Sequence, residues 1–171
     1  MKRLLFMIVA IGAFCSPVLA TAQDQNGWTD AKWGMTGPEL EKAFAGKIKP
    51  NAEGGYEIDS YAIDRLTFGV NFYMGGAGLK KVRLMSQKSN LPLDDDYRKL
   101  AGLLEQKYGP AIAKDIPDKF PAKSEVFNTS WGLPATKITL GYLRAYVAPT
   151  IGLYSITISY EAQGSSTKDK L

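Results

Sequence analysis

The stretch LTFGVNFYMGGAGLKKVRLMS, residues 66–86, decides the fold of this chain. Apolar Phe68, Val70 and Phe72 alternate with polar or small residues. In residues 81–84, apolar Val82 and Leu84 alternate with basic Lys81 and Arg83. The glycines between the two arms predict a turn. Successive side chains of a strand point to opposite faces, so the pattern predicts an antiparallel hairpin with one covered face and one face open to water.

Four further segments carry strand signals. Residues 137–142 and 154–160 alternate strictly between apolar and polar positions. Residues 56–63 and 125–131 predict weaker strands, and the phase of the first slips near Ser60 as a bulge would make it.

Two segments carry helix signals. Thr36 and Glu39 have the spacing of a capping box, which predicts a short helix that ends at Gly46. A second helix is predicted from the acidic Asp94–Asp96, where negative charge suits the helix dipole, to Gly109. Consecutive helix residues point in different directions, so the acidic run favours capping over a site for a hard cation.

These elements together predict an α+β fold. The expected architecture is a single twisted antiparallel sheet of about six to seven strands with two helices packed on one face. The order of elements suggests a helix-plus-three-strand unit that occurs twice. Residues 23–162 are expected to form this one domain, and the polar residues 163–171 are expected to be a disordered tail.

Residues 1–22 predict export. A short basic start, an apolar run over residues 4–14 and small residues after it follow the order of a secretory signal peptide. Cleavage before Gln23 is expected, and cleavage after Ala20 is the alternative. The run is shorter than the roughly 20 residues that cross a bilayer, so no transmembrane segment is expected. The expected location is the periplasm of a Gram-negative bacterium, or secretion from it.

Composition excludes most familiar catalytic chemistry. The 171-residue chain has no histidine, and its one cysteine, Cys15, lies in the predicted signal peptide. A histidine triad, a histidine metal site, a thiolate nucleophile and a disulfide are therefore not expected in the mature chain, nor is a cofactor. Loss of Lys2 and Arg3 with the signal lowers the formal net charge from +4 to +2, which predicts no nucleic-acid partner.

A hydrolase that uses two carboxylates needs no histidine and stays open as an alternative. The acidic candidates are Glu53, Glu57, Asp59, Asp64, Asp115, Asp118 and Glu125. The candidate serine–lysine pairs are Ser86 with Lys88 and Ser124 with Lys123. No motif surrounds either set, so solvated surface charge is the favoured interpretation and no catalytic residue is assigned.

The opening W-x4-WGMT at residues 28–36 and the helix ending KYGP at residues 107–110 resemble small exported proteins of Gram-negative bacteria. This resemblance implies export and supplies no catalytic residue. The predicted tandem units are also similar in architecture to periplasmic inhibitor and envelope-assembly modules such as those with the β-lactamase-inhibitor-like fold.

The predicted function is a non-enzymatic periplasmic module that binds a protein or an envelope component through the open sheet face. The alternatives are a carboxylate-based hydrolase acting on an envelope polymer and an envelope structural factor without a small ligand. The candidate binding residues are Tyr73, Lys81, Arg83, Thr67 and Asn71, which alternation turns away from the core. An aromatic ring beside two cations offers apolar area and directional charge together.

Overall fold

The computed structural model describes residues 26–148 and 151–164. The predicted signal peptide, both candidate cleavage sites and residues 165–171 of the predicted tail lie outside the described residues. The helices are α1 (Gly37–Phe44) and α2 (Asp94–Tyr108). The strands are β1 (Gly27–Trp28), β2 (Ala31–Lys32), β3 (Lys49–Pro50), β4 (Tyr56–Ile63), β5 (Leu66–Gly75), β6 (Gly78–Ser86), β7 (Ala113–Lys114), β8 (Glu125–Gly132), β9 (Thr136–Ala148) and β10 (Ile151–Ala162).

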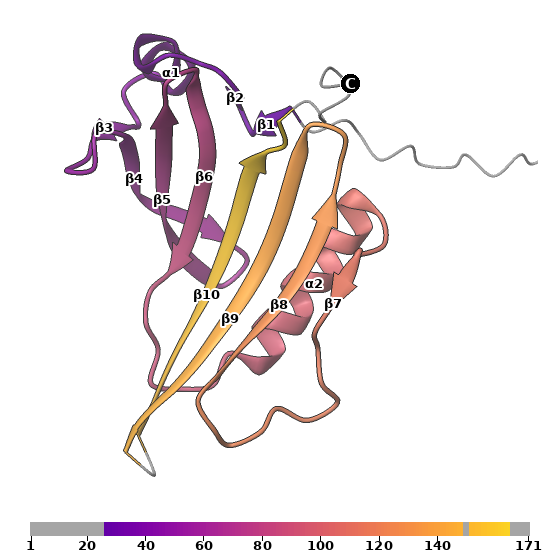
Figure 1. The fold of residues 1–171 in the computed structure, drawn as a ribbon. Coiled ribbons are helices and arrows are strands. Elements are labelled where there is room, and N and C mark those ends of the chain that lie inside the picture. The colour runs from indigo at the N-terminus through magenta and orange to yellow at the C-terminus, as the bar shows by residue number, and fades with distance from the viewer. Residues whose placement is uncertain (1–25, 149–150, 165–171) are drawn as a thin grey trace, which may run out of the picture.

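One large antiparallel sheet dominates the molecule (Figure 1). Its eight strands lie in the order β3-β4-β5-β6-β10-β9-β8-β7, and β1 and β2 form a separate two-stranded sheet. The described chain is therefore mostly β. The prediction of an α+β fold, with one sheet of six to seven strands and two helices packed on one face, is wrong.

Very short strands explain the wrong strand number. β3 and β7 have two residues each and form the two edges of the sheet. Two residues cannot show an alternating pattern, so no sequence signal marked these strands. The repeated unit is a helix followed by four strands: α1 with β3 to β6, and α2 with β7 to β10.

The helices contribute individual side chains to the core and do not form a layer across the sheet. Phe44 at the end of α1 meets Phe72 of β5, with ring centroids 5.2 Å apart. Tyr97 of α2 stacks on Tyr142 of β9 at 5.4 Å. α1 lies at one end of β5 and β6, whereas β9 and β10, with 13 and 12 residues, extend beyond both helices (Figure 1).

Both ring contacts fall on one face of the sheet, here called the core face. Phe72 lies opposite Val82 of β6, which lies opposite Tyr160 of β10. Tyr142 lies on the same face, because its register partner Ile156 and Tyr160 are four residues apart on β10. These five side chains are buried. The other side of the same strands is called the open face.

The WGMT segment that carries the sequence resemblance has a structural role. The Gly34 N–H donates to the Leu79 carbonyl at 2.9 Å, and the Leu79 N–H donates to the Met35 carbonyl at 2.8 Å. The Trp33 indole N–H donates to Thr136 Oγ1 of β9 at 2.8 Å. The segment therefore fixes the start of β6 and reaches the second half of the chain.

Two residues of the acidic run join α2 to β9 and to the turn between β4 and β5. Asp94 accepts hydrogen bonds from the Tyr142 hydroxyl at 2.6 Å and from Arg144 Nη1 at 3.2 Å. Asp96 is buried and accepts two from Arg65, at 2.5 and 2.7 Å. These carboxylates therefore stabilise the contact between α2 and the sheet. The sequence predicted only a capping and helix-dipole role for them.

Candidate binding surface on the open face

The open face consists of the residues that alternate with the core, and strand register arranges them in rows. The arginine row is Glu57, Asn71, Arg83, Ser159, Thr139 and Ser130, from β4 to β8. The lysine row is Tyr73, Lys81, Glu161 and Lys137. The glycine row, on the other side of the arginine row, is Gly69, Met85, Thr157, Gly141 and Asn128.

Arg83 lies on β6, between Asn71 of β5 and Ser159 of β10. Its guanidinium carbon is 5.5 Å from the centroid of the Tyr73 ring, which is a cation–π distance. Its Nε is buried and finds no hydrogen-bond acceptor among the described residues. Leaving a buried donor unpaired costs about 1–3 kcal/mol, so an incoming oxygen that reached this nitrogen would recover part of that cost.

The charges around Arg83 are mainly positive. Lys81 donates a hydrogen bond to Glu161 at 2.5 Å, and Lys137 lies opposite Glu161 on β9. Glu57, at the end of the arginine row, is 3.4 Å from Lys49. In the lysine row Lys81 and Lys137 outnumber Glu161, which favours a partner that carries negative charge.

The part of the open face beyond the glycine row is apolar. Val126 of β8 lies opposite Leu143 of β9, and their exposed fractions are 52% and 42%. Met85, in the glycine row itself, is 46% exposed. Single exposed apolar residues are ordinary, but three on one sheet face beside a charged cluster are typical of a contact surface.

Four of the five predicted site residues lie together. Asn71 and Tyr73 of β5 are the register partners of Arg83 and Lys81 of β6, and all four are half-buried. Thr67 faces the same side but lies four residues from Asn71, which is about 13 Å along a strand. It is therefore outside the cluster.

Ser159 and Glu161 of β10 were not among the predicted site residues. Ser159 and Glu161 reach Arg83 and Lys81 through the pairing of β10 with β6. Alternation predicts which face such residues occupy, but it does not predict which strand lies next to them. Leu143 had a readable signal, because it is a large apolar residue in the polar phase of β9.

Four of the seven carboxylates of the hydrolase alternative contact lysines, namely Glu57, Asp59, Asp64 and Glu125. Glu57 and Asp59 both contact Lys49, at 3.4 and 2.8 Å. The hydrogen bond from Lys99, 2.8 Å long, lowers the pKa of Asp64 below its ordinary value. A general acid must keep its proton near neutral pH, and contact with a lysine favours the ionised form instead.

The serines of the candidate serine–lysine pairs accept hydrogen bonds from backbone N–H groups. Ser86 Oγ accepts a hydrogen bond from the Ile156 N–H at 2.9 Å. Ser124 Oγ accepts one from the Tyr146 N–H at 2.9 Å. These hydroxyls stabilise strand ends, and neither contact activates a nucleophile.

No protein-family model, curated protein or solved structure matches the chain. Neither described helix is long and apolar enough to cross a membrane. Within residues 26–148 and 151–164, no three His, Cys, Asp or Glu side chains gather as metal ligands would.

Proposed function

We propose that this protein is a non-enzymatic binding module, exported to the periplasm, that holds a protein or an envelope component on its open face. Arg83 carries the proposal. Its buried Nε lacks an acceptor, and it forms no ion pair with any carboxylate of the described residues. A half-buried arginine that has no ion-pair partner can bind an anionic group of a ligand.

The chemistry around Arg83 supports an acidic contact on the partner. A guanidinium binds a carboxylate or phosphate through two parallel hydrogen bonds. Asn71 and Ser159, on the flanking strands, offer further donors at the same level. Tyr73 supplies a rigid apolar ring, and arginine and tyrosine are among the residues that most often dominate binding energy at interfaces.

The apolar part of the open face supports a macromolecular partner. Val126 and Leu143 lie beyond the glycine row and Met85 lies in it, so a ligand that reached both them and Arg83 would cross several strands. Strands are about 4.8 Å apart, which gives a span of more than 10 Å. A protein segment or an envelope polymer covers such a surface more readily than a small molecule.

Capture from an extract of the producing cells, followed by cross-linking and mass spectrometry, tests this proposal. Wild-type bait and the Lys114→Ala variant, which removes an equal charge from a distant surface, are expected to retain the same partner. The Arg83→Ala variant is expected to lose it with an unchanged thermal midpoint. Equal capture by the Arg83→Ala variant would place the binding site elsewhere.

N-terminal sequencing of the native protein tests export separately. A mature chain that begins at Gln23 or Thr21 is expected. A native chain that begins at Met1 would contradict the proposed location.

A further inference from the structure

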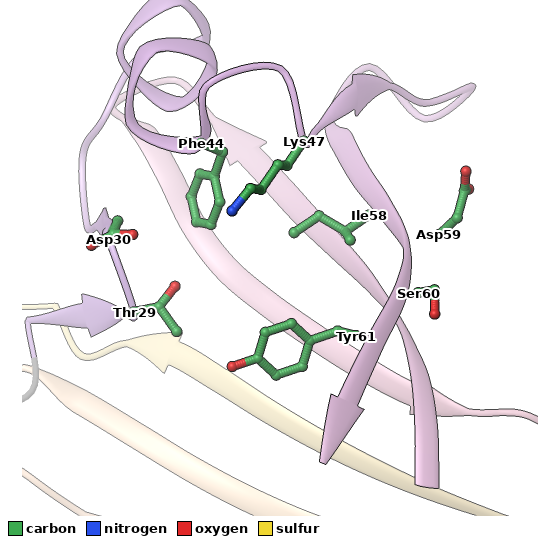
Figure 2. Close-up of a pocket in the computed structure, with 8 residues that line it drawn as sticks. All are labelled: Thr29, Asp30, Phe44, Lys47, Ile58, Asp59, Ser60 and Tyr61. Atoms are coloured by element: carbon green, nitrogen blue, oxygen red, sulfur yellow. The ribbon is translucent and has the colours of Figure 1, made fainter.

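A second candidate site lies on the core-face side, where α1 ends beside β4. A cavity of about 580 Å³ opens there. Figure 2 shows Phe44, Ile58 and Tyr61 pointing into this cavity from α1 and β4. Thr29, in the turn between β1 and β2, closes its far side. Phe44, Ile58 and Tyr61 form the apolar part of the lining, and the other five lining residues are polar or charged.

Backbone geometry creates this cavity. The register of β4 against β5 shifts between Ile58 and Tyr61, which changes the direction of the strand at the cavity wall. Ala45 and Gly46 have φ values of +46° and +79°, so the chain turns sharply out of α1 immediately after Phe44.

A second cavity continues the first along β4. Its volume is about 260 Å³, and it shares Thr29 and Tyr61 with the first cavity. Ile63, Leu103 and Leu104 line it on the side of α2. The two cavities together are called the trough. From Ile58 to Ile63 the strand extends about 17 Å, so the trough is long, and its lining is mainly apolar in the second cavity.

A lysine lies at the α1 end of the trough. Figure 2 shows the Lys47 side chain reaching toward the Phe44 ring. Lys47 forms no ion pair with an acidic residue in the described part of the chain. Asp59 points away from the cavity and contacts Lys49 at 2.8 Å. Asp30 stands on the opposite wall, and Lys107 borders the second cavity.

We propose that the trough binds a fatty acid, with the carboxylate at Lys47 and the acyl chain along β4 toward Leu103. The long apolar lining matches a flexible hydrocarbon chain. The cation at the α1 end matches one anionic head group. This site lies across the sheet from Arg83, so it does not depend on the proposed function of the open face.

Isothermal titration calorimetry with dodecanoate, below its micelle concentration, tests the site on the mature protein. One-to-one binding is expected, with affinity about tenfold lower for decanoate because two methylenes leave the apolar lining. Dodecanol, which has no charge, is expected to bind about threefold more weakly than dodecanoate. Absent binding, or an affinity that is independent of chain length, would overturn the proposal.

Variants locate the two ends of the ligand. Lys47→Gln is expected to make dodecanoate bind like dodecanol, whereas Lys42→Gln, a matched change on α1 outside the trough, leaves the difference intact. Leu103 is 43% exposed, so Leu103→Gln is expected to weaken dodecanoate more than decanoate without unfolding the protein. Equal effects of the two lysine variants would overturn the assignment of the head group.

Two further measurements distinguish this site from a site on the open face and from a phospholipid site. Arg83→Ala is expected to bind dodecanoate as the wild type does, and a loss would show that the ligand occupies the open face. Lysophosphatidylglycerol is expected to bind more weakly than dodecanoate. Tight binding of this lipid without binding of dodecanoate would assign the trough to phospholipid and overturn the fatty-acid proposal.

Discussion

At the level of single residues, Thr36 and Glu39 form the capping box that begins α1. The Thr36 N–H and the Thr36 hydroxyl both donate to Glu39 Oε2, each at 2.8 Å. Thr36→Ala removes one of these bonds and also the acceptor for the Glu39 backbone N–H, and it is expected to cost about 1 kcal/mol. Glu39→Ala removes both bonds to Oε2 and should lower the urea midpoint as well. An unchanged midpoint for Thr36→Ala would mean that this box does not cap the helix.

The same contact predicts a pH dependence. The hydrogen bond from the Thr36 backbone lowers the pKa of Glu39. A carboxyl whose pKa falls on folding stabilises the fold above its unfolded pKa, and this stabilisation is lost as pH falls through the folded value. The difference in urea midpoint between wild type and Glu39→Ala should therefore shrink below about pH 4. A difference that is the same at pH 3 and pH 7 would contradict this.

Arg144 is the buried charge on which the far end of the core depends. Its side chain is 5% exposed, lies within 6 Å of the Phe120 and Tyr154 rings, and meets Asp94 at 3.2 Å. Asp94→Ala leaves this cation without a carboxylate and should cost about 3 kcal/mol. Adding Arg144→Met should recover part of the loss in urea unfolding. Strictly additive losses would show that the two residues do not interact.

At the level of elements, Gly78 fixes the start of β6. It has φ +95°, and a Cβ there would lie 2.2 Å from the Gly34 carbonyl oxygen. Gly78→Ala is expected to cost about 2–3 kcal/mol, because it combines a left-handed backbone with a clash against backbone. Gly76→Ala, in the same turn with open space around it, should change the midpoint little. Similar effects at both positions would mean that the backbone of the turn shifts and accommodates the added methyl group.

The long strands could be predicted from the sequence, because the alternation within each strand shows which of its side chains face the core. Phe72 and Tyr73 take opposite faces by alternation, and this placed four of the candidate site residues correctly on one side of one hairpin. The two-residue strands could not be predicted. Lys49 and Pro50 of β3 are both exposed, so burial marks neither of them, and pairing with β4 decides their structure.

The candidate site was incomplete for a similar reason. Ser159 completes the surroundings of Arg83, yet these residues are neighbours because β10 pairs with β6 across the middle of the sheet. Local patterns carry no information on pairings between distant segments. The aromatic trough was missed as well, since it depends on the bulge between Ile58 and Tyr61 and on where α1 ends.

At the level of the whole molecule, two halves of similar order share one core. Each half has a helix and four strands, and β6 meets β10 where they join. Val82 faces Tyr160 and Leu84 faces Ile158 across this seam, and all four are buried. A half released from its partner would expose this apolar row to water, which disfavours independent folding of either half.

The two halves are therefore expected to unfold in one transition. Trp28 is buried in the first half and Trp131 in the second, so each can report on its own half. Trp33 must be removed from both reporters, because its bond to Thr136 crosses between the halves. Two variants, Trp33→Phe with Trp131→Phe and Trp33→Phe with Trp28→Phe, leave one indole each. Within each variant, the urea midpoint from fluorescence should coincide with the midpoint from circular dichroism, as a two-state transition requires. In either variant, the fluorescence midpoint could instead differ from the circular dichroism midpoint. This result would mean that the seam between β6 and β10 opens before the core is lost.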